Sequence, residues 1–521
     1  MTFYPTYVPD PFVKENKFIK QTAEQRELPE FDEVKALLPQ PEWRNHDNTI
    51  ACYWKAWELA FKNLRQPTPA NGFVANYIDT AFNDHLFMWD SAFILLFGRY
   101  GRRAFDFQHT LDNLYAKQHP DGYICREIRE DDGGDTFERF DPSSTGPNVM
   151  PWTEWEYYQN FGDKERLAQV FPVLAAYHHW FRSYRTWPDG TYWASGWSCG
   201  MDNQPRLQDI TTQAVKLLPK SIEGEAVDLT AFFNLSQMFY HGHQAWVDTC
   251  LQQILSARLL IKMAGELGRQ EDGVELQKEI DDLSRTVNQF LWDEKTSFYY
   301  DRRRDGQLSE VKSIGAYWAL LADVVPPDQL AGFVAHLENP REFNRPHRIP
   351  TLSADHPEYV DRGGYWLGAV WAPTNYMTLK GLSQAGYDAL AHLIGLNSLT
   401  NVVTVFNETG TLWENYAPEI MSAGWPARPD FVGWSGLFPI TILFEYVFGL
   451  RPDIPHTHIV WDVRLLEKHA IRQYPFGKDG LLDLECQARS SAQEKPAIMA
   501  TSNIPVTLEV RWDGKVEEIQ L

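Results

Sequence analysis

The spacing of apolar residues indicates that most of the chain is helical. From about residue 48 to 450, apolar residues recur at steps of three and four with acidic or polar residues between them. This pattern predicts helices over residues 48–64, 91–98, 104–117, 153–161, 164–184, 229–238, 243–267, 275–291, 311–324, 328–337, 372–385, 388–404 and 436–446. Pairs of helices separated by loops are what an (α/α)6 barrel requires, so we expect an all-α fold built on that barrel. An α-solenoid or two helical bundles would give a similar number of helices.

The pattern changes after Pro455. Short β-like runs at residues 458–463, 481–488 and 506–512 are separated by turn signals at 478–480 and 513–514. The first 47 residues are rich in proline and acidic side chains. We therefore expect an N-terminal extension packed on the barrel (1–47), the helical barrel itself (48–454) and a small β-rich C-terminal region (455–521).

The bulk composition excludes several classes of function. A formal net charge of −22 over 521 residues, without any basic run, would repel phosphate backbones, so no nucleic-acid partner is expected. No apolar run reaches the roughly 20 residues that span a bilayer. The first twelve residues lack the basic start and apolar core of an export signal. We expect a cytoplasmic protein without a membrane partner.

The five cysteines are widely spaced and odd in number. Neither a disulfide framework nor a structural metal is indicated. The pairs His178–His179 and His241–His243 also lack the helical spacing and the acid of a zinc hydrolase.

Aromatic residues are unusually frequent, at 14% of the chain. Their flat faces can stack on the C–H faces of sugars, but a heavily aromatic core would give the same composition. Long connections rich in glycine, proline and tryptophan run over residues 131–151, 187–205, 340–364 and 407–434. Loops of this length in a compact domain are usually functional.

Two lone acids stand among the aromatic residues of these loops. Asp202 lies in the segment WSCGMDNQPR (197–206), and Glu414 lies in LWENYAP (412–418). A pair of carboxyl groups suits glycoside chemistry, because one can protonate a leaving oxygen while the other activates water. The ordinary alternatives are a turn or cap aspartate for Asp202 and a solvated loop acid for Glu414.

Four blocks in a fixed order carry a resemblance to known enzymes. The first is FMWDSAF (87–93), followed by NLYAKQ (113–118) and DGYI (121–124); the others are residues 197–206, YWLGAVW (365–371), and WENY (413–416) with GWS (433–435). From about residue 84 to 449 the chain resembles the clan of inverting glycosidases that holds trehalases and glycoside hydrolase family 63. That clan includes bacterial glucosylglycerate and mannosylglycerate hydrolases and α-glucosidases.

The resemblance implies that Asp202 is the general acid and Glu414 the general base. In inverting enzymes the two carboxyl groups lie roughly 6.5 to 9.5 Å apart, which leaves room for the attacking water. The resemblance also implies that Asp90 binds hydroxyls of the sugar ring, although an N-cap of a helix beginning at Ser91 would use the same residue. The other residues expected to bind substrate are Phe87, Trp89, Gln118, Asp121, Gly122, Trp197, Gly200, Arg206, Tyr365, Trp366, Gly368, Trp371 and Trp434.

Two of these residues, Arg206 and Trp371, keep a second interpretation. Arg206 could orient an acid or bind a substrate group, or form a surface salt bridge. Trp371 could pack at a helix end, and Gly368 could let substrate approach the backbone. Family 63 members often have Arg and Pro where this chain has Leu367 and Ala369, so the substrate preference is open.

The sequence thus predicts an inverting, exo-acting α-glycoside hydrolase without metal or organic cofactor. The favoured substrate is a small α-glucoside or short oligosaccharide, which makes the enzyme an α-glucosidase. Alternatives are an α-mannosidase-type enzyme or a glucosylglycerate or mannosylglycerate hydrolase. A non-catalytic carbohydrate-binding protein with mispositioned acids is the alternative from another class.

Overall fold

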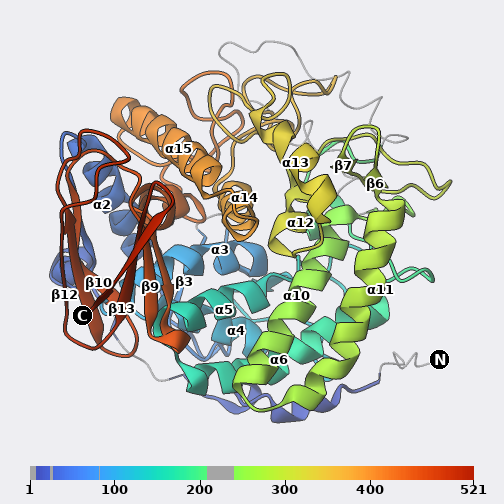
Figure 1. The fold of residues 1–521 in the computed structure, drawn as a ribbon. Coiled ribbons are helices and arrows are strands. Elements are labelled where there is room, and N and C mark those ends of the chain that lie inside the picture. The colour runs from blue at the N-terminus through green and yellow to red at the C-terminus, as the bar shows by residue number, and fades with distance from the viewer. Residues whose placement is uncertain (1–7, 24–26, 81–82, 208–239) are drawn as a thin grey trace, which may run out of the picture.

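The computed structural model describes residues 8–23, 27–80, 83–207 and 240–521 (Figure 1). Helix α6 matches its predicted bounds, whereas the predicted helices at 104–117 and 311–324 are much shorter in the structure. The predicted helix at 229–238 lies outside the described residues. The helices are α2 (Asp47–Lys62), α3 (Met88–Gly98), α4 (Thr110–Ala116), α5 (Met150–Phe161), α6 (Lys164–Tyr184), α7 (Gly196–Cys199), α10 (Val247–Glu266), α11 (Val274–Phe290), α12 (Trp318–Leu321), α13 (Pro327–Ala335), α14 (Ala372–Gln384), α15 (Asp388–Thr409), the short 3-10 turn η11 (Ser435–Leu437) and the π-helix η12 (Phe438–Val447).

The central helices contact one another in a cyclic order. Helix α3 packs on α5, α5 on α10, α10 on α12, α12 on α14, α14 on η11, and η11 packs back on α3. A second set lies outside them: α4 contacts α3, α6 contacts α5 and α10, α11 contacts α10, and α15 contacts α14 and η12. The residues discussed below come from the first turn of α3, the turn after α7 and the loops that precede α14 and η11.

The expectation of an all-α fold is wrong. The structure is 43% helix and 16% strand, and its described residues form five β-sheets. Two of them have four strands, in the orders β1-β10-β11-β12 and β14-β13-β9-β8. Their strands are β1 (Gln40–Trp43), β8 (Leu450–Asp453), β9 (His458–Asp462), β10 (His469–Phe476), β11 (Gly480–Cys486), β12 (Ile498–Ser502), β13 (Thr507–Trp512) and β14 (Lys515–Gln520).

The other three sheets are antiparallel pairs of short strands within the helical part, too short for a period-two pattern to be visible in the sequence. They pair β2 (Leu64–Arg65) with β3 (Tyr77–Ile78), β4 (His85–Phe87) with β5 (Glu127–Arg129), and β6 (Trp292–Asp293) with β7 (Phe298–Tyr299).

The three predicted C-terminal strands correspond to β9, β11 and β13. Strand β10 was missed because a register shift between Ile471 and Tyr474 breaks its alternation, as a β-bulge does. Strand β14 is an edge strand with charged residues at exposed positions, which resists pairing with other chains. Strand β1 comes from the N-terminal extension and pairs antiparallel with β10, so both ends of the chain build one sheet.

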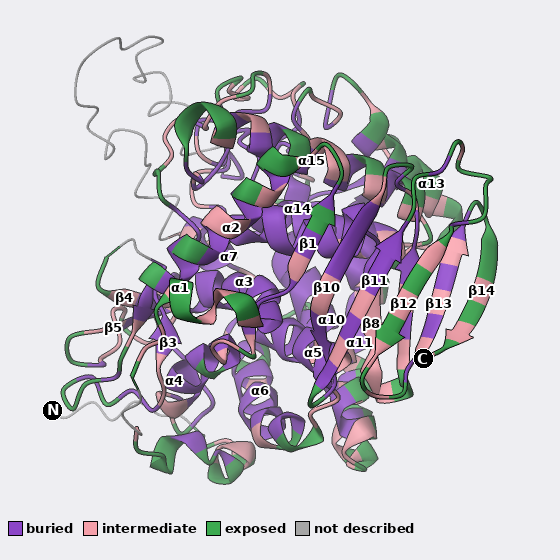
Figure 2. Cartoon of the chain, turned by 90° about the vertical axis from the view of Figure 1, so that its left-hand side faces the viewer, coloured by how far each residue is buried: buried purple, intermediate pink, exposed green. Residues whose placement is uncertain are grey.

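Helices and C-terminal strands share one hydrophobic core (Figure 2). Helix α15 alone among the described helices is long and apolar enough to cross a membrane by length and composition. It packs against α14, η12 and α2, which accounts for its apolar residues as core positions. The N-terminal extension contacts α6 through residues Pro11–Glu15 and α4 through Phe18–Lys20.

Candidate active site

Asp202 lies in the turn that follows the short helix α7. A reciprocal pair of hydrogen bonds between Ser195 and Ser198 caps this helix, with Ser198 N donating to Ser195 Oγ at 3.3 Å and Ser195 N donating to Ser198 Oγ at 2.6 Å. The helix ends at Gly200, whose φ of 77° is left-handed. This cap and this turn fix the direction in which the chain leaves α7 and presents Asp202.

Glu414 is held in a pairing between two loop segments. Its backbone N–H donates to Arg428 O at 2.9 Å, and Arg428 N donates to the Glu414 carboxylate at 3.1 Å. Trp434, at the N-terminal end of η11, donates from Nε1 to Glu414 O at 2.9 Å. The Glu414 residue is only 4% exposed, so it is not the solvated loop acid of the alternative interpretation.

Asp90, Asp202 and Glu414 form one acidic cluster, with Tyr365 beside it. Burial raises the pKa of Glu414 to about 7; Arg428 and a hydrogen bond from Tyr365 lower this pKa, and the charge of Asp202 raises it. Burial also raises the pKa of Tyr365, and all three carboxylates of the cluster add to that rise. Such charge effects weaken with distance and are screened by water, so the four groups lie within electrostatic reach of one another around Tyr365.

Asp202 has the electrostatic setting that a general acid needs. Burial raises the pKa of Asp202 to about 7, while the Arg126 guanidinium lowers it and Glu127 raises it. Burial likewise raises the pKa of Asp90 well above its usual value, with Arg126 opposing the rise. Carboxyl groups with a pKa near neutrality can exchange a proton at neutral pH.

Asn203 joins the Asp202 turn to the segment that carries Tyr365. Its Nδ2 donates to Gly364 O at 3.0 Å, and its Oδ1 accepts from Trp366 N at 2.9 Å. Tyr365, between these two partners, has a φ of 66°, a left-handed value that is rare for a non-glycine residue. Strained conformations of this kind persist where the surroundings over-determine them, often at functional sites.

Trp89 and Asp90 lie in the first turn of α3, which begins at Met88 and has Phe87 as its N-cap. The interpretation of Asp90 as the N-cap is therefore wrong. A Cβ at Gly200 would lie 2.8 Å from the Trp89 ring, so only glycine allows the Asp202 loop to pass this indole. Phe87 and Trp197 are both half-buried beside these segments.

Trp366, Trp371 and Trp434 form an aromatic layer behind Tyr365. Trp366 and Trp371 stack at 4.0 Å with 4° between their planes, and both are almost fully buried. Trp371 also donates from Nε1 to Tyr365 O at 3.1 Å and lies 5.4 Å from the Trp434 ring. These tryptophans support Tyr365 and Glu414, in agreement with helix-end packing for Trp371.

A family model described as "Mannosylglycerate hydrolase MGH1-like glycoside hydrolase domain" matches residues 83–424, which is more than half of the chain. The chain belongs to this glycoside hydrolase family. The resemblance inferred from the sequence motifs is thereby confirmed.

Curated relatives of this glycoside hydrolase differ in substrate. A mannosylglycerate hydrolase of Thermus thermophilus is 25% identical over 361 residues, covering 60% of this chain and 85% of the relative. A probable mannosyl-oligosaccharide glucosidase of Schizosaccharomyces pombe is 23% identical over 305 residues, covering 52% of this chain but only 34% of the relative.

A solved structure shares the fold. A family 63 mannosylglycerate hydrolase from Thermus thermophilus, in complex with Tris and D-glycerate, superposes with a TM-score of 0.58 at 21% identity. The superposition covers 74% of this chain and 98% of that one.

The structure does not bring Gln118, Asp121 and Gly122 to the acidic cluster. Gln118 donates to Gly122 O and Val173 O at 3.1 and 2.9 Å, and its own oxygen accepts from Asn16. Asp121 pairs with Arg139. A Cβ at Gly122 would lie 2.2 Å from the Ala176 carbonyl of α6, which explains this glycine as a packing requirement.

Arg206 is neither a surface salt bridge nor a free ligand for substrate. It is 1% exposed and pairs with two buried acids, reaching Asp248 at 2.5 and 2.9 Å and Asp301 at 2.5 and 2.7 Å. Its guanidinium also lies 4.2 Å from the Trp246 ring. With its donors committed in this way, Arg206 anchors the chain that follows Asp202.

Gly368 is also explained by packing within the protein. A Cβ at this position would lie 2.7 Å from the Tyr359 ring.

Sequence reasoning missed Arg126, Asn203 and Arg428. Arg126 and Glu127 lie two and three residues after the DGYI block, and Asn203 directly follows Asp202, so proximity to the motifs was the available signal. No feature of the sequence marks Arg428, which meets Glu414 only through loop pairing.

The histidines do not join the acidic cluster. His178 bonds Ser256 Oγ at 2.9 Å and Glu279 at 3.1 Å in the core, and His179 pairs with Asp10 at 2.8 Å. His178 is buried, and His179 is partly exposed.

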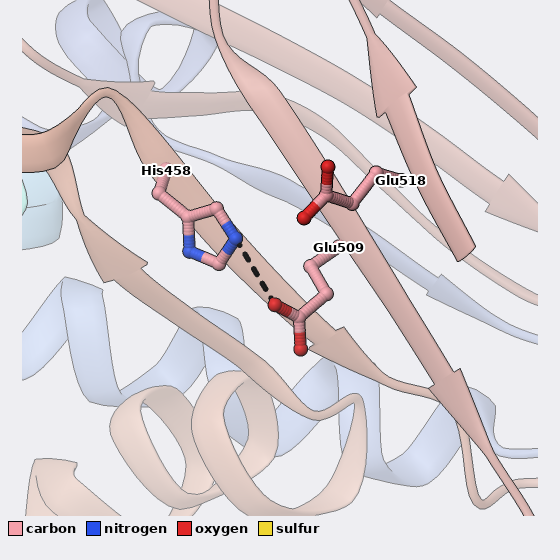
Figure 3. A group of neighbouring side chains, drawn as sticks. All are labelled: His458, Glu509 and Glu518. Carbon is pink, nitrogen blue, oxygen red and sulfur yellow. Dashed lines mark ion pairs between the residues drawn. The ribbon is translucent and has the colours of Figure 1, made fainter. Parts of the chain in front are cut away.

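Within the described part of the chain, one group has metal-ligand atoms within 4.8 Å of one another: His458, Glu509 and Glu518 (Figure 3). His458 pairs with Glu509 at 3.2 Å, and Glu509 also pairs with Arg511. This group lies on strands β9, β13 and β14, which contribute nothing to the acidic cluster.

Proposed function

We propose that this glycoside hydrolase is an inverting, exo-acting α-glycosidase in which Asp202 is the general acid and Glu414 the general base. The observation that carries the proposal is that Tyr365 links the two acids, which come from loops 212 positions apart in the sequence. Tyr365 hydrogen-bonds to Glu414, and Asn203, next to Asp202, bonds to the residues on both sides of Tyr365. Two carboxyl groups in one space, each with a pKa raised to about 7, can divide one proton between them.

In the proposed reaction the protonated Asp202 gives its proton to the glycosidic oxygen as the bond to the anomeric carbon breaks. Glu414, ionised, takes a proton from the water that attacks the opposite face of that carbon. The Arg428 N–H and the Tyr365 hydroxyl both bond to Glu414, and this favours its ionised form before the reaction. One water is consumed, and the released sugar has the inverted anomeric configuration.

We further propose an α-glucosidase acting on a small α-glucoside or a short oligosaccharide. The similarity to a glucosidase supports this choice, whereas the similarity to a mannosylglycerate hydrolase supports an α-mannoside or a glycosylated organic acid. Hydrolysis of a panel of α-glucosides, α-mannosides and their glycerate conjugates separates these substrates.

The test of the catalytic assignment uses Asp202→Asn and Glu414→Gln. Each is expected to lower kcat by at least about a hundredfold while the protein stays folded, as for loss of a general acid or base. Glu408→Gln, which alters an exposed acid at the end of α15, is the matched control and should keep wild-type turnover. Near-normal turnover in either active-site variant would refute its assigned role. Tight sugar binding by wild type without any product would favour the non-catalytic alternative.

A further inference from the structure

Arg126 is held firmly beside the acidic cluster. Its Nε pairs with Glu127 Oε1 at 3.0 Å, and its guanidinium lies 5.5 Å from the Trp197 ring and 5.7 Å from the Phe137 ring. Its carbonyl oxygen accepts from the N–H of Met88, the first residue of α3, at 2.8 Å. Contacts on several sides therefore fix the Arg126 side chain. The backbone of Arg126 bonds to the first turn of α3, which also carries Asp90.

Several buried atoms in this region have no hydrogen-bond partner among the described residues. Besides Trp89 Nε1 and Ser91 Oγ, they include Nη1 of Arg126, a donor, and Oδ1 of Asp90, an acceptor. Burial raises the pKa of Asp90 and the Arg126 charge lowers it, so the two groups are near each other, yet they form no ion pair. Buried polar atoms left without a partner in a native fold require an explanation, and here the donor and the acceptor are complementary.

We propose that a hydroxyl group of the sugar held for cleavage bridges Asp90 and Arg126, which makes Arg126 a specificity-determining residue. A hydroxyl accepts from a guanidinium N–H and donates to a carboxylate at the same time. With two hydrogen bonds of about 2.8 Å each, it joins groups that are too far apart to pair directly. The inference rests on the proposed function, because it takes the ring beside Asp90 to be the one that is cleaved.

The charges around Arg126 favour a neutral ring at this position. Arg126 is already paired with Glu127, and its charge also acts on the carboxyl groups of Asp90 and Asp202. One guanidinium among three carboxyl groups leaves no surplus positive charge to hold a further anion. The ligand class at this position is an uncharged, hydroxyl-bearing sugar such as a glucosyl or mannosyl unit, and a uronic acid is excluded.

The test compares Arg126→Met, which keeps an unbranched apolar stem but removes the charge and the donors, with Arg126→Lys, which keeps the charge. Arg102→Met is the matched control. Arg102 also lies over two aromatic rings, at 4.7 Å from Phe161 and 5.6 Å from Tyr157, lies 3.8 Å from Asp163, and has a buried Nη1 without a partner. Each variant is assayed on the cleaved glycoside and on its monodeoxy analogues, with thermal unfolding as the check of folding.

For the parent glycoside, Arg126→Met is expected to lower kcat/KM by about 10- to 100-fold, the loss typical of a hydrogen bond to a charged group. For the analogue that lacks the bridging hydroxyl, wild type should be slow and Arg126→Met should cause no further loss, because the two changes remove the same interaction. Arg126→Lys should retain part of the activity, and Arg102→Met all of it. Equal losses on every analogue, or no loss on the parent glycoside, would overturn the inference.

Failure of the proposed function gives a different result. If wild type cleaves no glycoside in the panel, the proposed catalytic function fails. Titration calorimetry with glucose, mannose and their deoxy derivatives then tests, independently of catalysis, whether a sugar hydroxyl bridges Asp90 and Arg126. Binding that requires both Arg126 and one particular hydroxyl supports the bridge. Binding that is unchanged in Arg126→Met, or that is absent in wild type, overturns it.

Discussion

Replacement of Asn203 by alanine would separate the two loops that build the site. Asn203 makes two hydrogen bonds between them, to Gly364 O at 3.0 Å and from Trp366 N at 2.9 Å. Each is worth about 1 kcal/mol net, and the partners left behind would lose hydrogen bonds in a largely buried place. We expect the free energy of unfolding to fall by about 2–4 kcal/mol.

The effect on turnover should exceed what stability alone explains. Asn203 directly follows Asp202, and Trp366 directly follows Tyr365. Loosening this link therefore moves Asp202, the proposed general acid, relative to Tyr365, which hydrogen-bonds to Glu414. A misplacement of about 1 Å can cost about a hundredfold in rate, and we expect kcat of the folded Asn203→Ala enzyme to fall by about 10- to 100-fold.

Asn288→Ala is the matched control for this experiment. Asn288 also bridges two segments, donating to Val324 O at 3.0 Å and accepting from the Tyr299 hydroxyl at 2.5 Å. Neither partner belongs to the acidic cluster. Chemical denaturation and initial-rate kinetics on both variants separate stability from catalysis. Asn203→Ala with wild-type kcat per folded molecule would refute the reasoning.

Other predictions follow from the same site. Because burial raises the pKa of both Asp202 and Glu414 to about 7, kcat/KM should follow a narrow bell centred near neutral pH: below it the base is protonated, above it the acid has lost its proton. A plateau extending two units to either side would contradict this. Arg206→Met leaves two buried aspartates unpaired and should lower the free energy of unfolding by about 3–5 kcal/mol, measured in urea; a raised KM with unchanged stability would instead indicate a substrate contact. Gly200→Ala should lower kcat by about tenfold because its Cβ would press on the indole beside the cluster. Gly190→Ala, also at positive φ but with open space around it, tests the backbone strain alone and should retain wild-type kcat.

Helices such as α11 could be predicted because they bury one face, and their apolar residues recur with the helical period. Helix α6 begins where Asp163 accepts from Arg166 N, a capping signal readable in the sequence. Strands were harder to predict: β1 and β10 pair across more than 400 positions, and β10 carries a bulge, so neither shows a clean alternation. The all-α expectation failed for this reason.

Asp202 and Glu414 could be singled out from the sequence because each is a lone acid in an aromatic loop, and their catalytic roles stay a prediction. The roles of Gln118 and Arg206 could not be predicted, because their donors are taken up by a carbonyl from α6 and by Asp301, partners that only the fold brings near. Arg126 could not be predicted for the same reason. Its proposed role depends on its closeness to Asp90 and Asp202 and on Nη1, which has no hydrogen-bond partner among the described residues.

The central claim is that Asp202 and Glu414 act from opposite faces of one sugar ring. The most direct test is proton NMR of the first sugar released from an α-glucoside, recorded before mutarotation. The account predicts that the β-anomer appears first, through inversion. Release of the α-anomer first would contradict it, because retention requires a covalent intermediate that a general base acting on water does not form.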